Sequence, residues 1–212
     1  MKAHEAIAPL RAITREEIEI YQRDGVVCLR DVLSSESVKA IEDAIETAMA
    51  SLDRSFGGYN LTKIVDAIAS DDQATLKAAS GKQYNVEALG QAIKASGKPL
   101  LVDGASEAPK RKGSFLLDSG VAAKDMNFRA FALLGECPEI AAALLQSEKI
   151  NFYDDQVFVK EPKTSERTAY HQDSSYFHFE GEQACTMWIP VDPVGFDSGT
   201  IRYVRGSHRW GF

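Results

Sequence analysis

Residues 169–177 read AYHQDSSYF, and this stretch says most about the fold and the chemistry of the chain. If residues 168–173 form a strand, His171 and Asp173 lie two apart and project from the same face. An imidazole and a carboxylate side by side make up two ligands of the 2-His-1-carboxylate triad. That triad holds non-haem Fe(II) and leaves coordination positions open. The triplet also fits a surface strand with a hydrogen-bonded His–Asp pair, so the residues alone leave both interpretations open.

The sequence on both sides of this stretch narrows the choice. It runs KEPKTSERTAYHQDSSYF over residues 160–177 and MWIPVDPVGFDSGTIRYVRGSHRWG over residues 187–211. These segments closely resemble the phytanoyl-CoA dioxygenase family of Fe(II)/2-oxoglutarate-dependent oxygenases. The resemblance is dense over residues 14–53 and 115–211, and it is thin over residues 54–113.

The resemblance implies an activity, its cofactors and a fold. The expected enzyme is a dioxygenase that uses Fe(II), O₂ and 2-oxoglutarate to hydroxylate an unactivated C–H bond of a small organic substrate, with succinate and CO₂ as co-products. The expected fold class is α+β, with a double-stranded β-helix (jelly-roll or cupin-like) core and N-terminal helices packed on it. The alternative function is binding of a small molecule or a metal without turnover.

Carried over residue by residue, the resemblance makes His171 and Asp173 the first two iron ligands. An aspartate at position 173 favours hydroxylation over halogenation, because related halogenases vacate that position for chloride. The resemblance also places three side chains near 2-oxoglutarate: Gln156, Lys160 and Trp188. Without it, the first two read as an ordinary polar strand edge and the third as a core aromatic residue.

The third iron ligand is not evident. His208 lies in a segment that resembles the family's turn after a core strand, and His178 lies in a predicted loop. In the family, the distal His and an Arg that pairs with 2-oxoglutarate come several tens of residues further on. Fewer strands are also found than the about eight of a jelly roll. We therefore expect the chain to be truncated at its C-terminus, and the rival interpretation is a short family member without oxygenase activity.

The residues that directly follow the two ligands are candidates for the substrate mouth: Ser174, Tyr176 and Phe177.

Local signals predict the first helix. Thr14 and Glu17 have capping-box spacing, and Gly25 suits the left-handed position that ends a helix. A short strand is expected over residues 26–30, where valines dominate.

A second helix is predicted after Ser34 or Ser35, either of which is suited to cap it. Its apolar residues recur at three-to-four spacing: Val38, Ile41, Ala44, Ile45, Ala48, Met49 and Leu52. Residues 85–96 are a further candidate helix. Helical residues 129–146 are interrupted at Cys137-Pro138, where proline fits the first turn of a new helix.

Strand-like segments follow, over residues 150–160, 167–173, 184–191 and 200–205. Helices first and strands afterwards favour the α+β class. We expect one domain over residues 1–212, made of a helix–strand–helix opening (14–53), a variable insert (54–113) and the first part of the jelly-roll core (114–212).

Composition excludes several classes of protein. The 212 residues are 44% hydrophobic and carry a net charge of −7, which favours a globular chain and disfavours nucleic-acid partners. No apolar run approaches the ~20 residues of a membrane span, so no membrane partner is expected. The three cysteines are far apart, which fits reduced thiols in a cytoplasmic protein. The oligomeric state and the substrate cannot be predicted.

Overall fold

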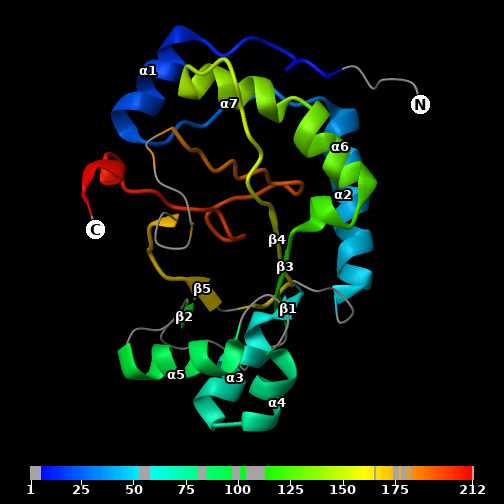
Figure 1. Cartoon of the computed structure of the whole chain (residues 1–212), viewed down its shortest axis with the longest axis vertical. Coiled ribbons are helices and arrows are strands. Elements are labelled where there is room, and N and C mark those ends of the chain that lie inside the picture. Colours follow the sequence, from blue (N-terminus) through cyan, green and yellow to red (C-terminus); the bar gives the residue numbers. More distant parts are fainter. Residues whose placement is uncertain are drawn as a thin grey trace. The chain divides into compact units, whose positions relative to one another are not determined.

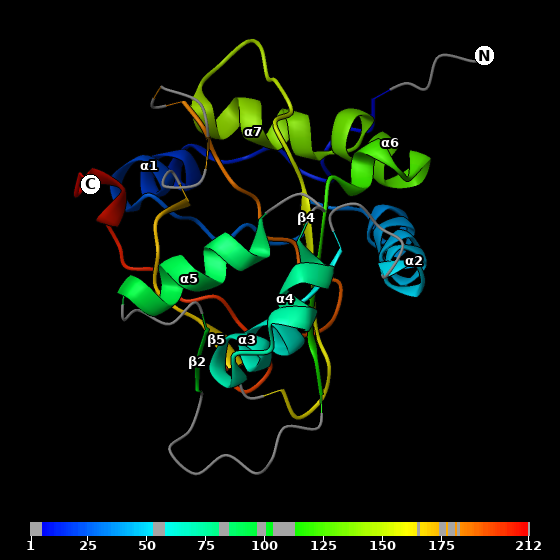
Figure 2. The same ribbon diagram turned by 60° about the horizontal axis from the view of Figure 1, so that its bottom comes forward.

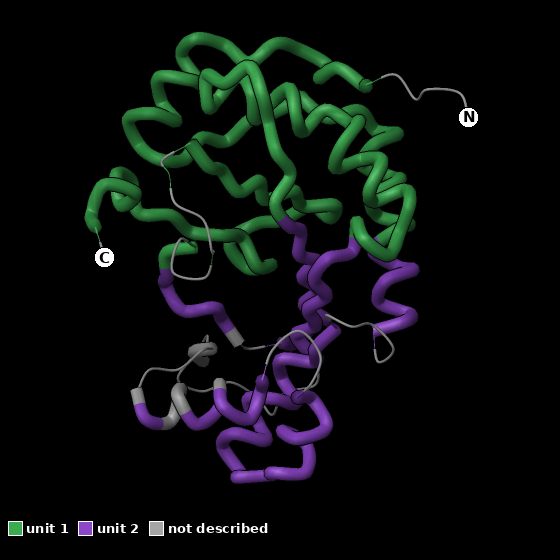
Figure 3. Tube along the Cα trace, viewed as in Figure 1, with its two compact units in different colours: residues 1–44, 122–153, 172–212 green, residues 45–121, 154–171 purple. Residues whose placement is uncertain are grey.

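The computed structural model describes residues 6–52, 58–80, 85–96, 101–103, 113–164, 166–173, 177, 181 and 183–211. The chain divides into two compact units (Figure 3). Unit 1 holds residues 1–44, 122–153 and 172–212, and unit 2 holds residues 45–121 and 154–171. The expected single domain with its internal boundaries stays a prediction.

The helix α1 (Arg15–Asp24) of unit 1 begins and ends where the sequence predicts. The Glu17 N–H donates to the Thr14 hydroxyl, and the Thr14 N–H donates to the Glu17 carboxylate at 2.8 Å. Gly25 ends the helix in the left-handed conformation, with φ 73°. The predicted capping box and the predicted helix end are therefore both confirmed.

The core of unit 1 forms where α1 packs against α7 (Cys137–Leu145), which Figure 1 shows side by side. Val32, Ile140 and Leu144 are buried at its centre. Half-buried apolar residues pack around them: Ile13, Ile18, Tyr21, Val27, Leu29, Leu33 and Met187. Ile18 and Tyr21 thus lie on the face of α1 that packs on the core.

The helix α6 (Met126–Leu134) precedes α7, and the chain breaks between them as predicted. The start of α6 lies a few residues before the predicted one, because the Asp125 side chain accepts the N–H of Phe128 at 2.8 Å and caps the helix there. Pro138 lies in the first turn of α7, as expected.

The helix α2 (Ser35–Ala50) carries the predicted apolar stripe, of which Ile41, Ala44 and Ala48 are buried. Ser34 is its capping residue, since its hydroxyl accepts the N–H of Ser37 at 3.1 Å. Of Ser34 and Ser35, which the sequence offers as capping residues, the structure therefore selects Ser34.

Unit 2 is built around a small antiparallel sheet of β1 (Tyr59–Asn60), β3 (Phe115–Ser119) and β4 (Gln156–Lys160) in the order β1-β3-β4. Leu117 lies opposite Phe158 in the register. The buried Thr62 hydroxyl accepts the N–H of Phe115 at 2.9 Å, and this bond connects the helix that follows β1 to the sheet. A second antiparallel pair joins β2 (Leu101–Asp103) to β5 (Glu166–Thr168).

The helices α3 (Leu61–Ser70), α4 (Gln73–Ala79) and α5 (Val86–Ser96) complete unit 2 and lie together in both ribbon views (Figures 1 and 2). Only α5 is predicted from the sequence. The signals for the other two are side-chain caps, since Asn60 accepts the N–H of Lys63 and Asp72 that of Thr75. Their apolar residues form one buried cluster: Tyr59, Ile64, Ala67, Ile68, Leu76, Val86 and Leu117.

Several strand predictions are wrong in the described part of the chain. Residues 26–30, 184–191 and 200–205 belong to no ladder there. Within residues 150–160 only Gln156–Lys160 are paired, and within residues 167–173 only Arg167 and Thr168 are. A β-branched, alternating sequence favours an extended backbone, but a strand also needs a partner for its N–H and C=O groups. That partner is set by the tertiary structure, which local sequence does not reveal.

The mixture of helices and sheet agrees with the α+β class. The expected jelly roll is not formed by the described residues, whose strands make one small open three-stranded sheet and one two-stranded pair. No helix among these residues is long and apolar enough to cross a membrane.

Candidate functional site

His171 lies in unit 2, three residues after β5, and its side chain is exposed. Its Nδ1 lies 2.8 Å from the carbonyl oxygen of Ala169. A carbonyl oxygen only accepts hydrogen bonds, so this contact requires a proton on Nδ1. The neutral ring then has its lone pair on Nε2. A metal-binding histidine commonly has this arrangement, with one nitrogen held by a backbone carbonyl and the other directed to the metal.

Asp173 lies in unit 1 and is also exposed. The Thr186 hydroxyl donates to its Oδ2 at 3.1 Å. Burial raises the pKa of the Tyr203 phenol, and the nearby negative charge of Asp173 raises it further. Carboxylates that bind metals are themselves hydrogen-bonded in the same way.

Gln156 and Lys160 lie on one face of β4 in unit 2, with Phe158 between them. All three are exposed, while Val157 on the other face is buried. The Lys160 ammonium lies 4.6 Å from the ring centroid of Phe115, a cation–π distance. Gln156 and Lys160 therefore share an exposed face of β4, and their role towards 2-oxoglutarate stays a prediction.

Trp188 lies in an extended segment of unit 1 with alternating burial. Cys185, Met187 and Ile189 are half-buried, whereas Thr186 and Trp188 are exposed on the other side. The alternation has the period of a strand although the described segment has no ladder partner. Trp188 therefore projects on the same side as the hydroxyl that binds Asp173.

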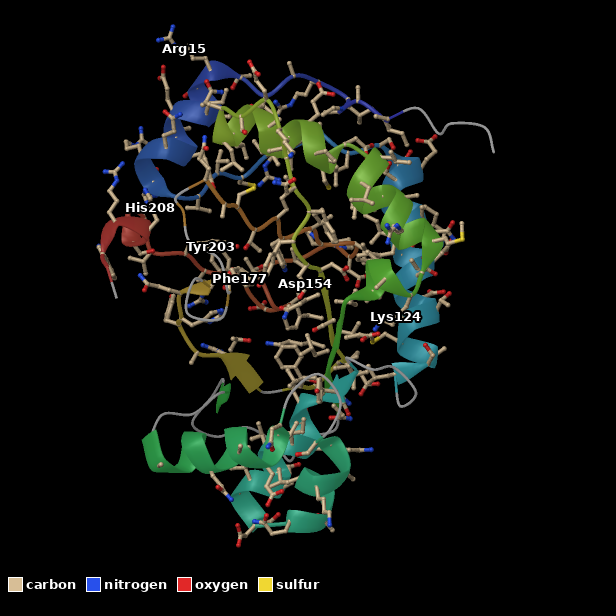
Figure 4. All side chains as sticks on the ribbon, in the orientation of Figure 1. Arg15, Lys124, Asp154, Phe177, Tyr203 and His208 are labelled. Atoms are coloured by element: carbon tan, nitrogen blue, oxygen red, sulfur yellow. The ribbon has the colours of Figure 1, made fainter. Side chains whose placement is uncertain are left out.

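The third metal ligand is not found among the described residues, which contain no group of three or more His, Cys, Asp or Glu side chains able to hold a metal ion. His208 lies on the short helix η4 (Ser207–Arg209), against Gly25 at the end of α1 (Figure 4). His178 lies outside the described residues. The donor chemistry of His171 and Asp173 thus fits two of the three protein ligands of an iron site.

The expected residues of the substrate mouth are only partly described. Phe177 packs edge-on against Tyr153 in unit 1, with ring centroids 5.3 Å apart. Ser174 and Tyr176 lie outside the described residues.

The family comparison settles what the motifs suggest. The model of the phytanoyl-CoA dioxygenase family, PhyH, matches residues 21–212. The chain belongs to the phytanoyl-CoA dioxygenase family. Members of this family have a cupin-like jelly-roll fold and are typically Fe(II)/2-oxoglutarate-dependent dioxygenases. The comparisons with curated proteins and with solved structures found no match.

Sequence reasoning missed two residues of this phytanoyl-CoA dioxygenase family member that lie around Asp173, namely Thr186 and Tyr203. Both belong to segments that the sequence predicts as strands. Thr186 is two residues before Trp188, so strand periodicity could have placed them on one side. Its contact with Asp173, thirteen residues away, has no local signal.

Proposed function

We propose that this chain is an Fe(II)/2-oxoglutarate-dependent hydroxylase in which His171 and Asp173 are two of the protein ligands of the iron. It acts on an unactivated C–H bond of a small organic substrate, with succinate and CO₂ as co-products. The observation that carries the proposal is that each side chain of the His-x-Asp pair makes a hydrogen bond to another protein group. Side chains that bind metals are commonly oriented in this way.

The side chains of the chain have separate roles in this proposal. The Ala169 carbonyl orients the imidazole of His171, and the Thr186 hydroxyl orients the carboxylate of Asp173. When bound, Fe(II) with 2-oxoglutarate supplies the O₂ activation and the C–H oxidation that amino-acid side chains cannot perform.

Three residues serve the co-substrate in the same proposal. The Lys160 ammonium offers a positive charge to a carboxylate of 2-oxoglutarate, and Gln156 offers amide hydrogen bonds from the same exposed face. Trp188 offers an apolar wall on the side where Thr186 and Asp173 meet. We place the protein in the cytoplasm, because its three cysteines are free thiols and a reducing compartment keeps them so.

The alternative function is binding of a metal or a small molecule without turnover. It is favoured by one observation, that His171 and Asp173 have no third ligand in a cluster with them among the described residues. Turnover separates the two functions, since only an oxygenase converts 2-oxoglutarate to succinate.

The test is Fe(II)-dependent formation of succinate by the purified chain, followed with and without O₂. His171→Ala and Asp173→Ala should each abolish it, because loss of a ligand costs more metal affinity than loss of an outer hydrogen bond. A matched control is Asp192→Ala, which removes an exposed aspartate from another position of unit 1. Wild-type succinate formation in both ligand variants contradicts the site. Tight binding of Mn(II) with no succinate from the wild-type chain favours the alternative.

A further inference from the structure

The segment that carries Thr186 is fixed on its other side by the core of unit 1. Met187 packs against the buried cluster of Val32, Ile140 and Leu144. The Gln183 side-chain amide donates to the Leu145 carbonyl at 3.1 Å. Because side chains alternate along an extended backbone, burial of Met187 directs Thr186 to the opposite side.

Thr186 is well suited to hold a carboxylate in one orientation. It is β-branched, so few side-chain rotamers are open to it, and its hydroxyl donates to one particular oxygen of Asp173, Oδ2, at 3.1 Å. A hydroxyl-to-carboxylate bond is charge-assisted and stronger than a neutral one. The bond therefore restricts the orientation of the Asp173 carboxylate.

We propose that Thr186 is a positioning residue for Asp173: by holding Oδ2 it fixes the orientation in which the carboxylate is offered to the metal. This inference rests on the proposed function, because it requires Asp173 to be a ligand. Hydrogen bonds that orient a metal-binding side chain raise its affinity for the metal. Thr186 thus acts on the metal through Asp173 and needs no contact with it.

The experiment measures the dissociation constant of Mn(II), a redox-silent substitute for Fe(II), by isothermal titration of the purified chain. Thr186→Val keeps the shape of the side chain and removes the hydroxyl, and it should weaken Mn(II) binding roughly 10- to 100-fold. Thr186→Ser restores a hydroxyl and should bind within about 3-fold of wild type, a smaller loss than a missing outer hydrogen bond causes. Thr200→Val is the matched control, because that hydroxyl bonds locally to the Gly195 carbonyl and should leave binding unchanged.

Thermal melting separates positioning from folding. Thr186 is exposed, so Thr186→Val should melt within a few degrees of wild type, about the effect of a surface substitution. Mn(II) binding by Thr186→Val equal to wild type, or equal losses in Thr186→Val and Thr186→Ser, overturns the positioning role. Asp173→Ala in the same titration distinguishes the two proposals. If Asp173→Ala abolishes binding while Thr186→Val binds Mn(II) as tightly as wild type, the positioning role alone fails. If Asp173→Ala binds as wild type, or if the wild-type chain binds no Mn(II), the iron site itself fails and the positioning role with it.

Discussion

Gly25 and His208 lie against each other, the glycine at the end of α1 and the histidine on the C-terminal turn. A Cβ added to Gly25 would meet the imidazole, 2.6 Å from its Cγ. Two hydrogen bonds secure the contact: the Gly206 N–H donates to the Asp24 carbonyl at 2.7 Å, and Arg209 donates to the Gln22 carbonyl at 2.9 Å. Residues 206–209 thereby satisfy carbonyl groups that the end of a helix leaves without an internal partner.

Gly25→Ala is expected to destabilise the protein. The left-handed backbone alone costs an alanine about 1–2 kcal/mol, and the new methyl group must also displace the ring of His208. The measurement is urea unfolding of Gly25→Ala, His208→Ala and the double variant. The double variant should recover part of the loss, because the ring is gone while the backbone strain remains. Equal stability of Gly25→Ala and wild type contradicts the contact.

Glu17 is expected to make stability depend on pH at acidic values. Its hydrogen bonds with the Arg11 guanidinium, and then those from Thr14, lower the pKa of its carboxyl from 4.5 to about 2, although burial opposes the shift. Because the folded pKa is depressed, the stabilisation is complete above pH 4.5 and is lost as the pH falls towards 2. Urea unfolding of wild type and Glu17→Gln should differ by about 1 kcal/mol at pH 6. The difference should narrow by pH 3, and a difference that does not change with pH would disprove the assignment.

Glu136 is expected to be important for the stability of unit 1. Its side chain is fully buried, and Oε1 accepts the N–H of Ser34 at 3.0 Å and the hydroxyl of Ser37 at 2.9 Å. Glu136→Ala leaves these two donors, of which the Ser37 hydroxyl is buried, without this acceptor and should cost about 1–3 kcal/mol for each one that stays unsatisfied. Glu136→Gln keeps an acceptor oxygen and should cost less. Urea unfolding checks both, and an unchanged midpoint in Glu136→Ala is the contrary result.

The same residue adds to the acid sensitivity of the fold. Burial favours the neutral carboxyl of Glu136, but the hydrogen bonds from Ser34 and Ser37 outweigh it, so its pKa lies below 4.5. The pKa of Glu136 is lowered, as is that of Glu17, so protonation of Glu136 as the pH falls also removes stability.

Lys160 is expected to bind 2-oxoglutarate if the proposed function holds. Lys160→Met keeps an apolar stem over the Phe115 ring and removes the charge that a carboxylate needs. The dissociation constant of 2-oxoglutarate in the presence of Mn(II) should rise by about 10-fold, which corresponds to the loss of one charged hydrogen bond. Lys149→Met, an exposed lysine of unit 1, serves as control. An unchanged constant in Lys160→Met contradicts the role of this lysine.

The helices could be predicted where a signal is local. The Thr14–Glu17 box, Gly25 and Ser34 lie within a turn or two of what they determine, and the structure confirms all three. The helices α3 and α4 are not predicted, although Asn60 and Asp72 cap them by the same local mechanism. Helix formation depends on contacts between residues three and four apart, which a sequence displays directly.

The strands were predicted less well because the partner of a strand lies elsewhere in the chain. Residues 184–191 have the expected alternation, with Met187 inward and Trp188 outward, yet no ladder among the described residues includes them. By contrast, the sequence predicts an extended β4, and it pairs with β3 across about 40 residues of intervening chain. Alternation sets which side of an extended chain is buried, and a partner decides whether a sheet forms.

The sequence by itself determined the family and the ends of α1, because motif order and capping can be read from the residues themselves without their tertiary contacts. Only the tertiary structure decided that Thr186 holds Asp173 and that His208 lies on Gly25. These contacts join residues that no local periodicity relates. They depend on how packing around the buried residues Val32, Ile140 and Leu144 positions segments that are distant in the sequence. This packing is driven by the burial of apolar surface and exists only in the folded chain.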